Sequence, residues 1–170
     1  VDSMYFVAEC YAEGKGVKQD FAKAAQWYKK VVRYHQNNEN KYIGPASNAL
    51  ALLYSEGKGV KHNKEKVLRY FKTSADTEFP PGMLNYAYEI LKQDESLSAL
   101  ADQDIVTVAK SIFKRVINSG DEKIDPNEQQ KFTKAIIEYQ LRKKKAEEDA
   151  ECKEFESIVE QMTHKTTHVN

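Results

Sequence analysis

The side chains most able to do chemistry in this chain are few and scattered. His164 and His168 are four residues apart, a spacing that places two imidazoles on one helix face as metal ligands. The end of the chain that carries them is expected to fray, so we predict no metal site. His62 lies in a polar loop, and no nucleophile, base and orienting group can be assembled from the remaining residues. The sequence therefore predicts a protein that is not an enzyme and has no cofactor.

Two further patterns imitate binding motifs. The tripeptide Gly-Lys-Gly occurs at 14–16 and 57–59, but neither copy has the G-x-x-x-x-G-K-[ST] spacing of a phosphate-binding loop. No strand precedes either copy, so a tight turn is the better interpretation. Trp27 and Tyr70 suggest an aromatic cage or a stacking platform. Because they occupy equivalent places in a repeat, packing between helices is the better interpretation for them as well.

Charge and composition exclude several classes of protein. The 26 basic and 26 acidic side chains balance, which argues against a dedicated nucleic-acid surface or a polybasic membrane surface. No apolar run approaches the roughly 20 residues that span a bilayer, so no membrane insertion is expected. Only Cys10 and Cys152 are present, which predicts no disulfide framework and a reducing, cytoplasmic location. The balance is uneven: residues 1–72 carry 13 basic and 7 acidic side chains, a net charge of +6.

The positions of these residues are set by an internal repeat. The segment YAEGKGVKQDFAKAAQWYKKV from Tyr11 matches YSEGKGVKHNKEKVLRYFKTS from Tyr54, at an offset of 43 residues. Apolar residues recur three and four apart on both sides of each glycine pair, which predicts a helix, a glycine turn and a second helix. Gly14, Gly16, Gly57 and Gly59 are expected to take left-handed turn conformations, with Val60 anchoring its turn in the core. Asp20 and Asn63 are expected to cap the second helices.

A weaker third unit and a different segment follow. Residues 82–92 and 105–117 are periodic enough for two more helices, but the polar stretch DESLSALADQ replaces the glycine turn between them. Pro80 and Pro81 are expected to separate the second unit from the third. Asp125-Pro126 is typical of a new helix start, and that helix is expected to run to about Met162. Its middle, including the basic block 142–145, is almost wholly charged and is expected to face solvent, while Phe155, Ile158, Val159 and Met162 restore an apolar end.

The pattern A-x-x-A-L-A-x-x-Y-x-x-G-x-G-V-x-x-[DN]-x-x-K-[AV]-x-x-[WY]-[YF] resembles the Sel-one-like repeat, a relative of the tetratricopeptide repeat. Tyr11 to Tyr28 and Ala46 to Phe71 carry it here. The resemblance implies an all-α fold: a right-handed α-solenoid of about three helix-turn-helix repeats, followed by a long C-terminal helix. We expect repeat units at about 1–36, 37–79 and 80–120, the third degenerate, with the connection QNNENKYIG carrying a polar insertion between the first two. Residues 121–170 would form a helix that caps the array or projects from it, and the chain would be a piece of a longer array.

The resemblance also implies a function. Solenoids of this kind are adaptors or scaffolds that hold a partner protein or peptide on a concave face lined mainly by first helices. By register, the residues expected to face a partner are Tyr5, Glu9, Asn48, Leu52, Leu84 and Tyr88. The C-terminal helix is expected to promote self-association. The alternatives are a regulatory or targeting module of a larger enzyme or secreted effector and, more remotely, a catalytic domain.

Overall fold

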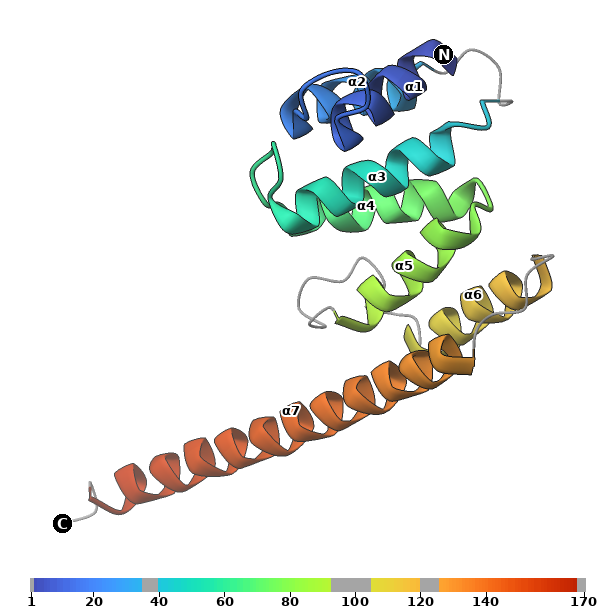
Figure 1. Cartoon of the computed structure of the whole chain (residues 1–170). Helices are drawn as coiled ribbons and strands as arrows, with labels where there is room; N and C mark the ends of the chain where they lie inside the picture. The colour runs from blue at the N-terminus through green and yellow to red at the C-terminus, as the bar shows by residue number, and fades with distance from the viewer. Residues whose placement is uncertain (1, 35–39, 93–104, 120–125, 168–170) are drawn as a thin grey trace. The chain divides into compact units, whose positions relative to one another are not determined.

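The computed structural model describes residues 2–34, 40–92, 105–119 and 126–167, and these residues form seven α-helices with no strand among them (Figure 1). The helices are α1 (Asp2–Glu13), α2 (Phe21–Arg33), α3 (Ile43–Glu56), α4 (Lys64–Asp76), α5 (Pro80–Lys92), α6 (Ile105–Ser119) and α7 (Pro126–Thr167). The chain divides into two compact units, Val1–Asp125 and Pro126–Asn170. The all-α fold predicted from the periodicity is confirmed.

In the first unit each helix packs on the next one along the chain, from α1 on α2 to α5 on α6, and α3 also contacts α5 (Figure 1). The side chains that fill these contacts are those of the predicted apolar stripes. Tyr28, Leu50 and Ile90 are almost fully buried, one in each of α2, α3 and α5. Serial packing of helix pairs is the arrangement expected of a repeat array, since each repeat can bury its apolar face only against a neighbour.

The second helices of both glycine-containing units begin where the sequence predicts. Asp20 and Asn63 have extended backbones, and their side-chain oxygens accept from the main-chain N–H of Lys23 at 2.9 Å and of Lys66 at 2.8 Å. Each bond satisfies one of the donors that the first turn of a helix leaves unpaired. The two repeats therefore share a capping mechanism, although one cap carries a charge and the other does not.

Two glycines inside helices allow α3 and α5 to approach the end of α4. A Cβ at Gly82 would collide with Oγ of Ser74, and a Cβ at Gly44 would collide with Thr77 and Phe79. Ser74 is fully buried between them, and its hydroxyl donates to the Gly44 carbonyl at 2.7 Å. The bond supplies a partner for the buried Ser74 hydroxyl, which would otherwise be costly to desolvate.

Some boundaries differ from the predicted ones. The helix expected from Ala46 begins at Ile43, because Ile43 and Gly44 are buried and extend the packed face, so the predicted connection 36–44 ends two residues early. Pro80 and Pro81 do not precede α5 but form its first turn, where a proline removes only a donor that the helix does not use. The expected polar linker 94–103 and the expected boundary after Gly120 lie outside the described residues.

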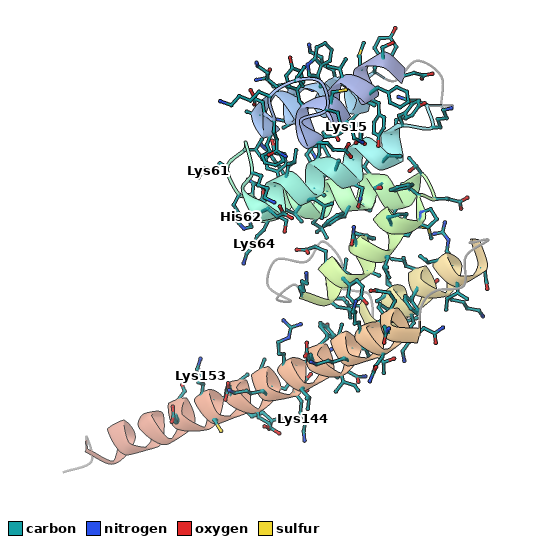
Figure 2. The ribbon with its side chains drawn as sticks, viewed as in Figure 1. Lys15, Lys61, His62, Lys64, Lys144 and Lys153 are labelled. Carbon is teal, nitrogen blue, oxygen red and sulfur yellow. The ribbon has the colours of Figure 1, made fainter. Side chains whose placement is uncertain are left out.

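The second unit is built on α7, which begins at Pro126 as predicted and extends for 42 residues, or roughly 63 Å at 1.5 Å per residue. Phe132, Ile136 and Tyr139 are buried, whereas every residue from 140 to 154 is exposed. Lys144 pairs with Glu148 at 3.6 Å within the charged middle, and Lys144 and Lys153 both extend from the helix in Figure 2. The side chains of the apolar end, Phe155, Ile158, Val159 and Met162, are outside the description. Within the described part of the chain, no helix combines the length and apolar character that crossing a membrane requires.

Candidate functional site

The two glycine turns have the conformations that their sequence predicts. Gly14, Gly16, Gly57 and Gly59 have φ values of 74°, 71°, 67° and 66°, in the left-handed region that side chains rarely adopt. In each turn the first glycine and the lysine after it donate to one carbonyl near the end of the preceding helix, that of Cys10 or that of Leu53. These bonds close the helix, so the turns are structural.

The second turn also docks on the preceding repeat. A Cβ at Gly59 would collide with the backbone of Phe21 and Ala22 at the start of α2, whereas a Cβ at Gly16 would meet nothing within 4 Å. Val60 was expected to anchor this turn in the core, but it is only half-buried, and its equivalent Val17 is exposed. The close backbone approach of Gly59, not the valine, therefore joins the turn to α2.

This docking creates a pocket at the boundary between the two repeats. Its volume is about 360 Å³, and it is lined by Lys29 of α2, Tyr54 of α3 and residues of the turn and of α4, namely Val60, Lys61, His62, Asn63 and Lys66. Figure 2 shows Lys61 and His62 at the turn and Lys64 at the start of α4. No local pattern in the sequence predicts this pocket, because its wall comes from two different repeats.

The pocket carries positive charge from three lysines. Nζ of Lys29 lies 5.4 Å, and Nζ of Lys66 5.0 Å, from the centre of the Tyr54 ring. Lys66 Nζ also donates to the Tyr54 hydroxyl over 3.5 Å. Among the described residues, no carboxylate lies within ion-pairing distance of Lys29, Lys61 or Lys66. Three lysines thus line one small cavity, and no carboxylate in the described part of the chain pairs with them.

The positive charge of these lysines changes the pKa of the Tyr54 phenol. Burial is the largest influence and raises its pKa, but hydrogen bonds and charges from Lys29 and Lys66 oppose burial and together outweigh it. The pKa of Tyr54 is therefore lowered from its ordinary value. Stabilising an anion at the phenol oxygen is evidence that the pocket favours negative charge.

His62 orients one wall of the pocket. Its Nδ1 lies 3.0 Å from the carbonyl oxygen of Tyr54 and 3.1 Å from that of Ser55. Carbonyls only accept, so Nδ1 must carry the proton. The equivalent residue of the first repeat, Gln19, makes a similar bond to the carbonyl of Ala12 at 2.8 Å. This shared role identifies His62 as a clamp on the end of α3 and gives no support for a catalytic base.

The first repeat has a related arrangement that supplies its own counter-charge. Lys23 Nζ lies 5.3 Å from the centre of the Tyr11 ring, which is similar to the 5.0 Å between Lys66 Nζ and the centre of the Tyr54 ring. There, however, Asp20 takes the place of Asn63, and its carboxylate pairs with Lys23 Nζ at 3.6 Å. The backbone N–H of Lys23 is the main reason that the pKa of Asp20 is lowered. Asn63 leaves the second repeat without this negative charge.

Tyr5 and Glu9, the residues of α1 that were predicted to face a partner, contact other residues of the protein instead. Tyr28 Oη donates to the Glu9 carboxylate at 2.5 Å, and the Tyr5 ring stacks on Tyr42 at 4.9 Å between centres. Burial, followed by the charge of Glu9, raises the pKa of Tyr5 to about 12. Phe6, next to Tyr5, is 55% exposed. The surface of α1 therefore offers Phe6 more directly than it offers Tyr5.

The residues of α3 and α5 that were predicted to face a partner also differ in how accessible they are. Asn48 Oδ1 accepts from Asn85 Nδ2 at 2.8 Å, which links the two first helices. Leu84 and Tyr88 are half-buried, whereas Leu52 is 41% exposed. Of the six predicted contact residues, Leu52 is thus the apolar one most accessible to a partner.

The aromatic pair does not pack equally in the two repeats. Tyr70 is buried and stacks on Tyr54 at 5.8 Å between ring centres, as expected of a packing residue. Trp27 is only half-buried, and Nζ of Lys30 lies 3.9 Å from the centre of its ring. The packing between helices that was predicted for both residues is therefore complete at Tyr70 but only partial at Trp27, and the fully packed aromatic residue of α2 is Tyr28.

Within the described residues, no group of three His, Cys, Asp or Glu side chains is close enough to hold a metal ion. The side chains of His164 and His168, the pair considered as ligands, lie outside that part of the chain. Cys10 and Cys152 are free thiols.

The comparisons with known proteins agree with the repeat geometry. The family described as Sel1 repeat matches residues 1–30 and 44–76. A solved structure that this chain resembles is c5321, a protective antigen present in uropathogenic Escherichia coli strains displaying an SLR fold; the TM-score is 0.55 and the sequence identity 23%. The match covers 71% of this chain but only 23% of that one. No curated protein matches the sequence. The two matched segments are consecutive helix pairs with the same glycine turn, and this part of the chain consists of Sel1-like repeats.

Proposed function

We propose that this protein is an adaptor or scaffold that binds a partner protein or peptide through the first helices of its repeat array. The observation that carries the proposal is the stacked pair of Sel1 repeats, since such repeats are typically protein-interaction modules without catalytic activity. An array of helix pairs offers an extended surface to a partner instead of a closed pocket for a reaction.

Exposed apolar side chains on the first helices support this proposal. Phe6 on α1 is 55% exposed and Leu52 on α3 is 41% exposed. Large apolar and aromatic residues at the centre of an interface supply most of its binding energy. The free thiols of Cys10 and Cys152 agree with a reducing compartment, and a cytoplasmic location is part of the proposal.

The test is capture of a partner by the immobilised protein from a lysate of the source organism, followed by mass spectrometry. Leu52→Asp places a charge on the proposed surface, and Ile117→Asp is the matched control, because Ile117 lies on the second helix α6 and is similarly exposed, at 43% against 41%. We expect a captured protein that is lost with Leu52→Asp and retained with Ile117→Asp. Equal capture by both variants and the unaltered protein would contradict binding through the first helices.

A further inference from the structure

We propose that the pocket between α2 and the α3–α4 turn binds the carboxylate of an acidic segment in a protein partner, with Lys29, Lys61 and Lys66 as the cationic groups that hold it. The inference rests on the proposed protein-binding function and specifies the chemistry of the partner at one site. It concerns residues that the first-helix surface does not include.

The arrangement of the lysines favours an anion between them. Lys29 and Lys66 extend from different helices, and their ammonium groups lie 5.4 Å and 5.0 Å from the same ring, that of Tyr54. Lys61 lines the same cavity from the turn. Like charges held around one cavity repel each other, and within the described residues no carboxylate relieves this repulsion. A bound carboxylate would supply the missing charge.

The backbone around the pocket also favours a negatively charged ligand. The cavity includes Asn63, the residue that caps the N-terminus of α4. The unpaired N–H groups and the dipole of a helix make its N-terminus favourable for an anion. The lowered pKa of Tyr54 agrees with this polarity, because Lys29 and Lys66 favour negative charge at the phenol oxygen beside them. The lysines, the cavity and the N-terminus of α4 thus all favour an anionic ligand.

The size and walls of the pocket favour an acidic side chain over a free inorganic anion. At about 30 Å³ for each water, the cavity of about 360 Å³ has room for roughly a dozen waters. A single phosphate would leave most of that space filled with solvent. The Tyr54 ring and Val60 supply apolar wall for the methylene stem of a glutamate. The net charge of +6 over residues 1–72 would also attract an acidic partner from a distance.

The first repeat provides an internal control for the experiment. Asp20 occupies the position of Asn63 and pairs with Lys23, the counterpart of Lys66. Asn63→Asp therefore gives the second repeat the same carboxylate that the first repeat has at this position, and it places that carboxylate among the pocket lysines. Asparagine and aspartate cap helices about equally well, so the substitution should leave the fold and the melting temperature nearly unchanged. Lys29→Gln is a second variant that removes a cation without touching the cap.

The test is a titration of the ¹⁵N-labelled chain with a glutamate-rich peptide, followed by amide chemical shifts in NMR spectra. The peptide's glutamine counterpart and inorganic phosphate are the comparison ligands. We expect the glutamate peptide to shift the amides of Tyr54, Lys61 and Lys66, and the glutamine peptide to leave them in place. Asn63→Asp and Lys29→Gln should each weaken the binding by about threefold to fivefold, since each reduces the net positive charge that attracts the bound carboxylate. Lys18→Gln, at the first-repeat counterpart of Lys61, should bind as the unaltered chain does.

Three outcomes would overturn the inference: no shifts with the glutamate peptide, shifts that survive Asn63→Asp unchanged, or phosphate binding as tightly as the peptide, which would indicate a small-anion site. The capture experiment with Leu52→Asp does not alter the pocket, so the two proposals can fail separately. A captured partner that is lost with Leu52→Asp but unaffected by Asn63→Asp would exclude the pocket and leave the protein-binding function standing. Failure to capture any partner would count against the protein-binding function itself.

Discussion

Replacing Gly59 with alanine tests whether the second repeat docks on the first through its glycine turn. The new Cβ would collide with the backbone of Phe21 and Ala22 at the start of α2, and it would sit at a φ of 66° that alanine disfavours. Strain at positive φ costs about 1 to 2 kcal/mol. Overpacking against a backbone adds about 1 to 3 kcal/mol, because the two elements must move apart. The expected loss of unfolding free energy is therefore about 2 to 5 kcal/mol.

Gly16→Ala is the matched control, since Gly16 has a similar φ of 71° and its Cβ would meet nothing within 4 Å. It should lose only the strain, about 1 to 2 kcal/mol. Gly57→Ala belongs with this control, because its Cβ would have no neighbour closer than 3.9 Å. Urea denaturation followed by far-ultraviolet circular dichroism measures all three variants. Losses for Gly59→Ala and Gly16→Ala that agree within about 0.5 kcal/mol would refute docking of the turn on α2.

Three further perturbations test other parts of the structure. Ser74→Ala should lose about 0.5 to 1.5 kcal/mol in denaturation experiments, since it removes a buried hydrogen bond between α4 and α3; a neutral result would mean that this bond adds nothing to stability. Lys66→Gln should raise the pKa of Tyr54, measured by NMR of ¹³C-labelled tyrosine, because it removes a cation that favours the phenolate; an unchanged or lower pKa would contradict the assigned cause. Truncation after Arg142 should leave the melting temperature nearly intact while weakening self-association in sedimentation experiments, since residues 143–154 are all exposed; a much earlier melt would show that the removed half stabilises the fold.

The repeat and its turns could be predicted from the sequence because they depend on local rules. A glycine is required wherever the backbone takes a left-handed turn, and an asparagine or aspartate is favoured where a helix begins. Gly57 and Asn63 carry these signals within a few residues of the structure they determine. Periodicity likewise locates α6, because its apolar face must be buried, and the Asp125-Pro126 pair locates the start of α7.

The contacts between repeats could not be predicted, because they depend on residues far apart in the chain. Ser74 fits between Gly44 and Gly82 only after α3, α4 and α5 have packed, and nothing local distinguishes these glycines from others. Trp27 and Tyr70 are equivalent in sequence, yet only Tyr70 is buried. Repeat equivalence therefore predicts the position of a side chain in its helix but not what the neighbouring repeat contributes.

The pocket could not be predicted for the same reason, although the sequence contains part of its pattern. A tyrosine followed twelve residues later by a lysine occurs in both repeats, as Tyr11 with Lys23 and Tyr54 with Lys66. The exchange of Asp20 for Asn63 between these copies is also visible in the sequence. The contribution of Lys29 is not, because it comes from the preceding repeat and depends on how the repeats stack.

The most direct test of protein binding by the repeat array is hydrogen–deuterium exchange of the whole chain with and without its captured partner, read peptide by peptide. Binding through the array predicts slower exchange in α3 around Leu52 and in the turn and helix start at 57–66, with α6 unchanged. Protection confined to α7, with α3 and the turn exchanging as in the free chain, would contradict it.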